Sequence, residues 1–367
     1  MKVVSTGSVY TLYDDTLLTY EELPPQSYVV RFSQTRGFYL EKYVEIEVKE
    51  NKIYGVHLSK VQKVLSSFES FNRNLGVILS GDKGIGKSLF ARLLSIEAIK
   101  KGLPLIVVDT FVPGIASYIE SIDQEVMVLF DEFDKTFGEV KAEDGKASPQ
   151  ANLLSLFDGV SGGKKLFVIT CNNMFKLNEY LINRPGRFHY HFRFDYPSPT
   201  EIREYLEDKL PEDRHGEIDA VVVFSQKVNL NYDCLRAIAF EIGRGESFKT
   251  AIADLNILNT GDQAYNFVVR FKNGRSLHRN KQYFDLFSPG TIALSMYNEN
   301  GHYEADLRLD AKNLMFDWQS CTYQAPAGCF ELEWGDEDDE ETKALIAAGV
   351  ERVIVTRCGE KSIHYAV

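Results

Sequence analysis

The chain has 367 residues, of which 44% are hydrophobic, and this length and hydrophobic content predict two or three domains with packed cores. It lacks both an uninterrupted apolar run of about 18 residues and the apolar core of a signal peptide, so we expect no membrane span and a cytoplasmic location. The formal net charge of −12 disfavours non-specific binding to nucleic acid, although it does not exclude a local basic groove.

The first 57 residues are typical of a small β-rich domain. Three stretches rich in β-branched and aromatic residues lie within residues 1–57, at residues 9–13, 27–32 and 43–48, and turn-forming pairs separate them. This segment is too short and too rich in strands to hold a catalytic core. Its sequence does not indicate what it recognises.

Residues 58–197 predict an α/β nucleotide-binding domain. Apolar side chains recur every three or four positions in residues 58–72, which predicts a helix, and residues 89–101 predict another. Four apolar runs without polar alternation are typical of parallel strands covered by helices on both faces. These runs are residues 75–80, 103–108, 126–130 and 165–170. The predicted fold class is therefore α/β with a parallel sheet.

A small helical domain, a lid, is predicted for residues 198–259. Ser198 and Glu201 have the spacing of a capping box, and Pro199 stands at the first helical position, so a helix begins here. Helical periodicity continues from this point to the end of the segment.

The last part of the chain, residues 262–367, predicts a second β-rich domain. A short polar break at residues 259–262 precedes it, and short apolar and aromatic stretches then alternate with turn signals. The acidic run at residues 336–341 is expected to be a solvated loop. The predicted architecture is thus an α/β core with a helical lid, flanked by β-rich domains at both ends.

A glycine-rich motif connects the first buried strand to the helix that follows it. The pattern GxxxxGK[ST] is fitted by Gly81, Asp82, Lys83, Gly84, Ile85, Gly86, Lys87 and Ser88. Such a turn lets backbone N–H groups and a helix N-terminus bind phosphate. Lys87 is expected to reach the β- and γ-phosphates of ATP, Ser88 to ligate Mg²⁺, and Leu89 to complete the nucleotide site. A chance glycine-rich turn is the alternative, which the strand–turn–helix context disfavours.

Two adjacent carboxylates end the apolar run at residues 126–130. Burying a carboxylate costs free energy, and two of them directly after five apolar residues are unusual. We therefore expect Asp131 and Glu132 to have a function. Asp131 would orient Mg²⁺ through its water shell, and Glu132 would polarise the attacking water as a general base. A strand that simply reaches the surface here is the alternative. Together with the glycine-rich motif, these residues indicate a P-loop ATPase that uses ATP and Mg²⁺.

Further motifs resemble those of the AAA family. The next strand ends in Asn172–Asn173, and the turn Arg184–Arg187, with the sequence Arg-Pro-Gly-Arg, follows, as in the second region of homology of that family. Residues 131–134 look like the Walker B ending of AAA proteins, and residues 152–159 look like a helix typical of them. The resemblance covers residues 58–258, and the arrangement looks like uncharacterised AAA ATPases of tailed phages and bacteria.

The resemblance implies roles for individual side chains. Asn173 would be sensor 1, which holds the attacking water or the γ-phosphate, with Asn172 as the alternative. Arg184 and Arg187 would be arginine fingers that reach the ATP of a neighbouring subunit, which implies a homo-oligomeric ring, expected to be hexameric. A surface turn with local salt bridges is the alternative for both. Arg236 resembles the sensor 2 arginine of many lids, and an ordinary exposed arginine is an equal alternative.

Two weaker assignments concern loops. AAA unfoldases place an aromatic pore loop near Phe111 and Tyr118, but packed loop aromatics are the favoured interpretation of both residues. With packed aromatics favoured, peptide threading is not predicted. Tyr54 and Gly55 are candidates for the adenine pocket by their position before the first helix.

The sequence predicts an ATP-hydrolysing AAA ring that remodels or translocates a macromolecule. The two fingers, the acidic balance and the flanking β domains favour a protein partner. The alternative is a nucleic-acid-handling ATPase such as a helicase or a clamp or helicase loader, which Arg236 and the compact core favour. A nucleotide-gated scaffold is a third hypothesis, and the presence of Glu132 argues against it.

Overall fold

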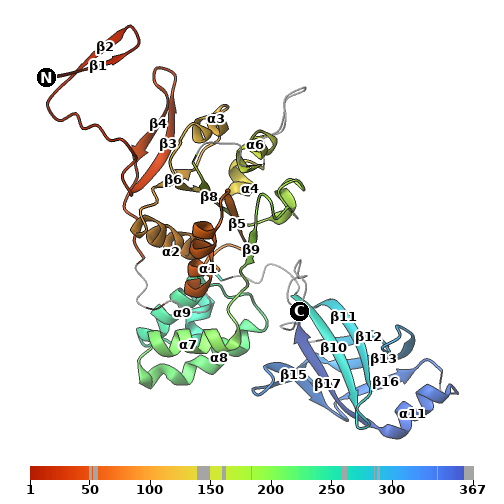
Figure 1. Ribbon diagram of the computed structural model, residues 1–367. Coiled ribbons are helices and arrows are strands. Elements are labelled where there is room, and N and C mark those ends of the chain that lie inside the picture. Colours follow the sequence, from red (N-terminus) through yellow and green to blue (C-terminus); the bar gives the residue numbers. More distant parts are fainter. Residues whose placement is uncertain are drawn as a thin grey trace. The chain divides into compact units, whose positions relative to one another are not determined.

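The computed structural model describes residues 1–48, 52, 57–138, 149–158, 163–182, 184–257, 263–284, 286, 290–336 and 338–358. The chain forms two compact units, Met1–Asp195 and Tyr196–Val367, and each has its own hydrophobic core (Figure 1). Among the described helices, none has the length and apolar character needed to cross a membrane.

A seven-stranded sheet with the order β4-β3-β6-β7-β8-β5-β9 forms the centre of the first unit. Its strands are Ser27–Ser33 (β3), Gly37–Lys42 (β4), Leu75–Ser80 (β5), Leu105–Val108 (β6), Val126–Phe130 (β7), Lys165–Cys171 (β8) and Tyr190–Arg193 (β9). Neighbouring strands are parallel except at the edge, where β4 runs antiparallel to β3. Every residue of β5 to β8 is buried, which explains their unbroken apolar sequences. The predicted parallel sheet is confirmed.

Helices cover this sheet. They are His57–Ser70 (α1), Lys87–Lys100 (α2), Ile115–Glu120 (α3), Phe133–Thr136 (α4), Pro149–Asn152 (α5) and Leu154–Asp158 (α6), with a 3₁₀ turn at Met174–Lys176 (η1). The amphipathic pattern of α1 directs its apolar side chains into the core, and α1 packs on α2. Phe157 of α6 packs edge-on against Phe130 and Phe167, with ring centres 5.8 and 5.1 Å apart. The aromatic cluster thereby fixes the helices that follow β7.

The N-terminal strands divide between two sheets. Lys2–Thr6 (β1) and Val9–Tyr13 (β2) form a separate two-stranded hairpin, whereas β3 pairs with β6 and carries β4 with it. The sequence places all of these strands in one separate domain, and this is corrected for β3 and β4. The physical reason is the apolar sequence of β3, whose first residues are buried between β4 and β6. Residues 43–48, expected as a strand, form none.

The second unit begins with a helical segment. Its helices are Pro199–Lys209 (α7), Ile218–Ser225 (α8), Tyr232–Gly243 (α9) and Phe248–Asp254 (α10), with a 3₁₀ turn at Glu212–Glu217 (η2). At the start of α7 the backbone N–H of Glu201 donates to Ser198 Oγ at 3.3 Å, and the N–H of Ser198 donates to Glu201 Oε2 at 2.9 Å. The capping box predicted from the sequence is confirmed.

An antiparallel sheet of eight strands, with the order β14-β15-β17-β10-β11-β12-β13-β16, completes the second unit. Its strands are Gln263–Phe271 (β10), Ser276–Phe284 (β11), Thr291–Tyr297 (β12), Tyr303–Asp310 (β13), Met315–Asp317 (β14), Thr322–Pro326 (β15), Phe330–Trp334 (β16) and Val350–Arg357 (β17). The remaining elements are a 3₁₀ turn at Ala311–Asn313 (η3) and the helix Glu340–Ala348 (α11). The predicted C-terminal β-rich region is confirmed.

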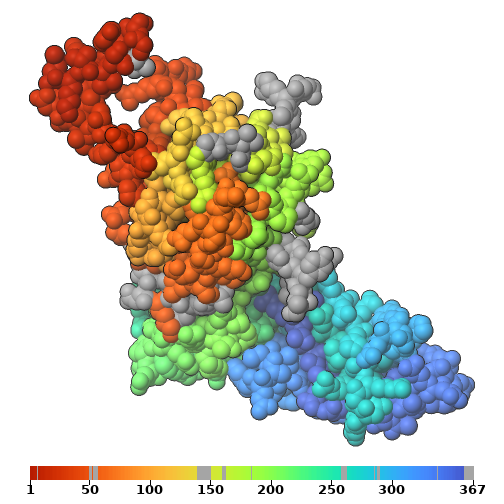
Figure 2. All heavy atoms as spheres, viewed as in Figure 1, coloured from red at the N-terminus to blue at the C-terminus, as the bar shows by residue number. Residues whose placement is uncertain are grey.

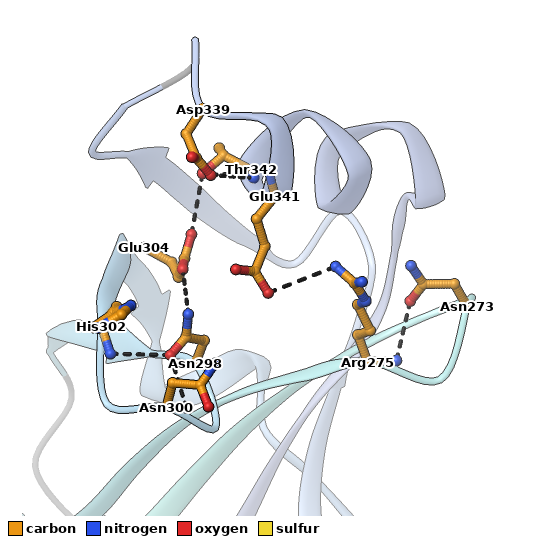
Figure 3. A network of polar contacts seen from close by, with 9 residues as sticks. All are labelled: Asn273, Arg275, Asn298, Asn300, His302, Glu304, Asp339, Glu341 and Thr342. Atoms are coloured by element: carbon orange, nitrogen blue, oxygen red, sulfur yellow. Dashed lines mark hydrogen bonds and ion pairs between the residues drawn. The ribbon is translucent and has the colours of Figure 1, made fainter.

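The acidic run at residues 336–341 includes the start of a helix, which corrects the expected loop. Asp339 caps α11 by accepting hydrogen bonds from the backbone N–H groups of Glu341 and Thr342. Glu304, which is buried, accepts hydrogen bonds from Asn298 Nδ2 at 2.7 Å and from Thr342 Oγ1 at 3.1 Å. This network joins α11 to the turn between β12 and β13 (Figure 3).

Hydrogen bonds join the helical segment of the second unit to its sheet. The hydroxyls of Tyr265 and Tyr323 donate to the carbonyls of Gln226 and Val223, at 3.2 and 3.3 Å. Arg357 Nη1 donates to the carbonyl of Ser225 at 2.7 Å. The sequence predicts two domains here, and these contacts hold both in one compact unit.

Candidate active site

The glycine-rich turn lies between β5 and α2, where the sequence predicts it. Gly81, Gly84 and Gly86 have φ angles of 134°, 75° and 103°, which residues with a side chain rarely adopt. A Cβ on Gly81 would lie 2.2 Å from the carbonyl oxygen of Phe194, and one on Gly86 would lie 3.0 Å from His57 Nε2. The backbone conformation and the close packing of this turn therefore require glycine.

Lys87 is the first residue of α2, and only 6% of it is exposed. Its Nζ donates to the carbonyl oxygens of Gly81 at 2.7 Å and of Asp82 at 2.5 Å, so the ammonium group lies inside the turn. Burial lowers the pKa of Lys87, and the nearby carboxylates, with Asp82 foremost, oppose this shift. A buried cation beside a helix N-terminus suits a phosphate group. These residues therefore fit the phosphates of a nucleotide.

Asp131 and Glu132 follow β7 at the carboxyl edge of the sheet. Thr170 of the neighbouring strand β8 donates through Oγ1 to Asp131 Oδ1 at 2.7 Å. Thr170 Oγ1 also accepts the backbone N–H of Glu132 at 2.8 Å. Thr170 thereby fixes both acidic residues. Its role is not predictable from the sequence, since its only signal there is a hydroxyl near the end of an apolar strand.

Two oxygen groups, one at this corner of the sheet and one at the start of α2, are candidate ligands for Mg²⁺. Asp131 offers a carboxylate at the end of β7, and Ser88 stands exposed in the first turn of α2. Among the described residues, no group of three or more His, Cys, Asp or Glu side chains converges on a common point. Mg²⁺ takes oxygen ligands and is usually held by one or two protein groups together with phosphate oxygens. The donor set at this corner fits that chemistry.

Glu132 has an unusual backbone conformation. Its φ of 47° and ψ of 48° lie in the left-handed region, which is uncommon for a residue with a side chain and is often found at functional sites. Its carboxylate accepts a hydrogen bond from Lys135 Nζ at 2.7 Å, and the Asn172 side chain lies near it. These contacts, with that of Lys135 foremost, lower the pKa of Glu132. The carboxylate is therefore ionised near neutral pH, as a general base must be.

The loop after β8 is held by a buried carboxylate. Asp134, at the start of α4, accepts the backbone N–H groups of Asn172 and Asn173 through its two oxygens, both at 3.1 Å. Asn173 caps η1 by accepting the N–H of Phe175 through Oδ1 at 2.9 Å. The preference for Asn173 as sensor 1, with Asn172 as the alternative, stays a prediction.

The turn Arg184–Arg187, called the finger turn here, holds two arginines whose surroundings differ. Arg187 pairs with Asp158 through Nε, and through Nη2 at 2.6 Å, and its Nη1 donates to the carbonyl of Tyr180 at 2.6 Å. This pairing lowers the pKa of Asp158 and raises that of Arg187. Arg184 is exposed, with its guanidinium 5.4 Å from the centre of the Tyr180 ring. The local salt bridge that the sequence allows for is thus formed by Arg187.

The finger turn lies at the opposite end of β5 from the glycine-rich turn of the same chain. The backbone N–H of His189 donates to the carbonyl of Gly76 at 2.9 Å, and Arg73 Nη1 donates to that of Gly186 at 3.3 Å. Gly76 is the second residue of β5, and Gly81 follows the last one. Because a strand rises about 3.3 Å per residue, the turn packs roughly 16 Å from Gly81.

Other predicted residues lie apart from this arrangement. Phe111 packs edge-on against Phe137, and Tyr118 stacks on Phe38, with ring centres 5.7 and 5.2 Å apart. Both are half-buried, in agreement with the packed-aromatic interpretation. Arg236 belongs to α9 in the second unit, where its Nη1 lies 3.4 Å from Asp233. The adenine-pocket candidates at residues 54–55 lie outside the described residues.

Comparison with known proteins finds similarity to one family over part of the chain. Residues 77–196 match the family described as ATPase family associated with various cellular activities (AAA). The chain is 26% identical over 179 residues to Tat-binding homolog 7 of Caenorhabditis elegans, a match that covers 42% of this chain and 14% of that protein. It is 28% identical over 193 residues to the proteasome-associated ATPase of Mycolicibacterium gilvum, covering 42% and 31%. The chain thus spans less than a third of the length of each relative.

Proposed function

The chain carries an AAA domain, and on this premise we propose that it hydrolyses Mg·ATP at a site completed by a second copy of itself. The observation that carries the proposal is the position of the finger turn, which packs against Gly76 at the far end of β5 from the glycine-rich turn. The resemblance to phage and bacterial AAA proteins, the hexameric state and the cytoplasmic location stay predictions.

Within one copy, the glycine-rich turn and the carboxyl edge of the sheet supply the nucleotide site. Backbone N–H groups of residues 81–89 and the Lys87 ammonium bind the phosphates. Ser88 and Asp131 hold Mg²⁺, which when bound neutralises charge on the phosphate oxygens. Glu132 accepts a proton from the attacking water, and the amide of Asn173, with Asn172 as the alternative, orients that water.

The second copy supplies Arg184. A separation of roughly 16 Å along β5 exceeds the reach of an arginine side chain, so Arg184 does not serve the ATP of its own chain. Its exposed guanidinium donates fixed positive charge to the phosphoryl group bound by a neighbour. Arg187 positions the turn through Asp158 instead of contacting phosphate. Each copy both gives and receives a finger, and in a head-to-tail interface this arrangement forms a ring when the rotation between copies closes.

A protein is the partner that this ring remodels. The net charge of −12 disfavours the nucleic-acid backbone, and one relative of the AAA domain is named as a proteasome-associated ATPase. A nucleic-acid partner is the competing outcome. It would show itself as salt-sensitive binding of single- or double-stranded DNA and as stimulation of ATP hydrolysis by DNA.

Mixing two inactive variants tests the shared site. Glu132→Gln lacks the general base and Arg184→Ala lacks the finger, so each alone should lose at least about 100-fold in kcat. Mixed assemblies contain some sites with an intact Glu132 on one side and an intact Arg184 on the other, and hydrolysis should return in part. Arg203→Ala, an exposed arginine of α7, is the control that should retain activity. No recovery on mixing, with both proteins assembled, would contradict a finger that acts in trans.

A further inference from the structure

His57 is a buried histidine that packs against the glycine-rich turn. It is the first residue of α1. Figure 2 shows the outer face of α1, in orange, at the surface of the first unit, whereas the exposed fraction of His57 is only 8%. The reaction proposed for the nucleotide site gives this side chain no role, and its surroundings indicate one.

Aromatic rings hold the imidazole of His57 in place. Its centre lies 5.2 Å from that of the Phe194 ring and 6.2 Å from that of the Phe90 ring. The rings of Phe90 and Phe194 are themselves 5.7 Å apart, and both side chains are buried. Aromatic pairs at such separations attract one another. The three rings, called the clamp here, therefore join α1, α2 and the segment after β9 into one packed cluster.

The clamp contacts the glycine-rich turn near both of its ends. A Cβ on Gly81 would lie 2.2 Å from the carbonyl oxygen of Phe194, and a Cβ on Gly86 would lie 3.0 Å from His57 Nε2. The backbone N–H of Phe90 donates to the carbonyl of Gly86 at 2.9 Å. His57 thus packs against the residue that ends the turn and begins α2.

The two glycines need support from outside the turn. Gly81 and Gly86 have φ angles of 134° and 103°, which glycine can adopt but does not maintain by itself, because it has wide conformational freedom. The turn binds phosphate through backbone N–H groups. If these groups point inward before the nucleotide arrives, binding does not carry the cost of ordering them. Gly86 also precedes Lys87 directly, so its backbone sets where the ammonium group begins.

We propose that His57 is a positioning residue for the nucleotide, which holds Gly86 in the phosphate-binding conformation before ATP binds. This role rests on the proposed function, in which the backbone N–H groups of residues 81–89 bind the phosphates. His57 transfers no proton and contacts no phosphate in this role, so its loss lowers nucleotide affinity more than turnover. Because the turn surrounds phosphates that ATP and ADP share, both nucleotides lose affinity by the same factor.

Titration calorimetry of His57→Ala in the Glu132→Gln background tests this role with Mg·ATP and Mg·ADP. The Kd of both nucleotides should rise about tenfold, because binding must now order the turn. With Glu132 intact, the KM for ATP should rise likewise while kcat changes by less than about threefold. His57→Gln, whose amide reaches the position of Nε2, should recover most of the affinity. His57→Leu fills similar space without this reach, so it should show the loss even if the alanine variant does not fold.

Leu65→Ala is the matched control, since Leu65 belongs to the same helix and has an exposed fraction of 1%. It should destabilise the protein without changing either Kd. Unchanged Kd values in folded His57→Ala or His57→Leu would overturn the positioning role and leave the proposed ATP site intact. A parent protein that binds neither nucleotide would overturn both.

Hydrogen exchange of the nucleotide-free protein gives a readout that does not depend on ATP. The amides of residues 81–89 should exchange about tenfold faster in His57→Ala than in the wild type, and saturating Mg·ADP should remove the difference. Leu65→Ala should leave the exchange of this turn unchanged. Equal exchange of residues 81–89 in His57→Ala and the wild type would show that the turn keeps its conformation without the imidazole, and would overturn the proposal.

Discussion

Asp134 is a buried side chain that takes no part in the proposed reaction. Its hydrogen bonds position the loop after β8. Each of its oxygens accepts one backbone N–H, so that Asn172 is held beside Glu132. In Asp134→Asn one oxygen becomes an NH₂ group that faces a second donor, which leaves a buried N–H without an acceptor. We expect a loss of about 1–3 kcal/mol in the free energy of unfolding and a fall in kcat with little change in ATP affinity.

Denaturant unfolding and steady-state hydrolysis measure the two effects in Asp134→Asn. Asp233→Asn is a suitable control, since Asp233 is an exposed carboxylate on α9 that pairs only weakly with Arg236. Unchanged kcat in a destabilised Asp134→Asn protein would mean that the loop after β8 keeps its position without this carboxylate.

Cys171, the last residue of β8, should resist alkylation in the folded protein. Burial, with a smaller contribution from Asp134, raises the pKa of its thiol to about 12. Because the thiolate is the reactive form and appears only near that pH, the Cys171 thiol stays protonated at about pH 8. Mass spectrometry after iodoacetamide treatment should find the partly exposed Cys321 modified and Cys171 intact until denaturant is added. Rapid modification of native Cys171 would contradict this environment.

Side chains that act through sequence-local motifs are predictable, and those that act across strands are not. Lys87, Asp131 and Glu132 lie in or directly after recognisable patterns, and the structure places them at one edge of the sheet. Thr170 supports Asp131 only because β7 and β8 are neighbours in the sheet.

The pairing of strands is likewise only partly predictable from the sequence. The unbroken apolar sequences of β5 to β8 predict a parallel sheet, because only strands covered on both faces lack polar alternation. The sequence of β3 has no feature that distinguishes a strand of a small domain from an edge strand of the main sheet. Its partner β6 is far along the chain, with Ser27 opposite Leu105. The helix α11 was also missed, since a run of carboxylates is more often a solvated loop.

The attachment of α11 to the β domain depends on the hydroxyl of Thr342. This hydroxyl donates to the buried Glu304, which also accepts from Asn298. Thr342→Val keeps the shape of the side chain but removes the donor, and we expect it to weaken the docking of α11 by about 1–3 kcal/mol. Hydrogen exchange of residues 340–348 should therefore accelerate. Thr342→Ser keeps the hydroxyl, so hydrogen exchange in this variant should be nearly as slow as in the wild type. If exchange accelerated equally in both variants, the cause would be a change in side-chain packing and not the lost hydrogen bond.

The organisation of the whole chain differs from four successive domains. β3 and β4 belong to the nucleotide-binding sheet, and the helical segment shares a compact unit with the C-terminal β domain. In a ring ATPase of this construction, the β domain would move with the helical segment during the nucleotide cycle. The contacts between Tyr265, Tyr323 and α8 are the physical basis for that expectation.

Arg357 is one of the side chains that join the helical segment to the sheet of the second unit. Besides Ser225, its guanidinium contacts Asn229 and donates to Gln263 Oε1 at 2.6 Å, and burial lowers its pKa. Arg357→Met would fill similar space but leave the carbonyl of Ser225 and two side-chain oxygens without this donor. A fully buried acceptor left unpaired costs about 1–3 kcal/mol, and these acceptors are partly buried.

We therefore expect Arg357→Met to uncouple the helical segment from the β domain. Hydrogen exchange in increasing denaturant should show α8 and β17 opening together in the wild type and α8 opening first in the variant. Arg308→Met is the control, because Arg308 forms only an exposed ion pair with Glu333 on the same sheet. If α8 and β17 still opened together in Arg357→Met, the apolar packing of Val223 against the β-domain core would be sufficient to join them. The motion of the β domain with the helical segment would then not depend on Arg357.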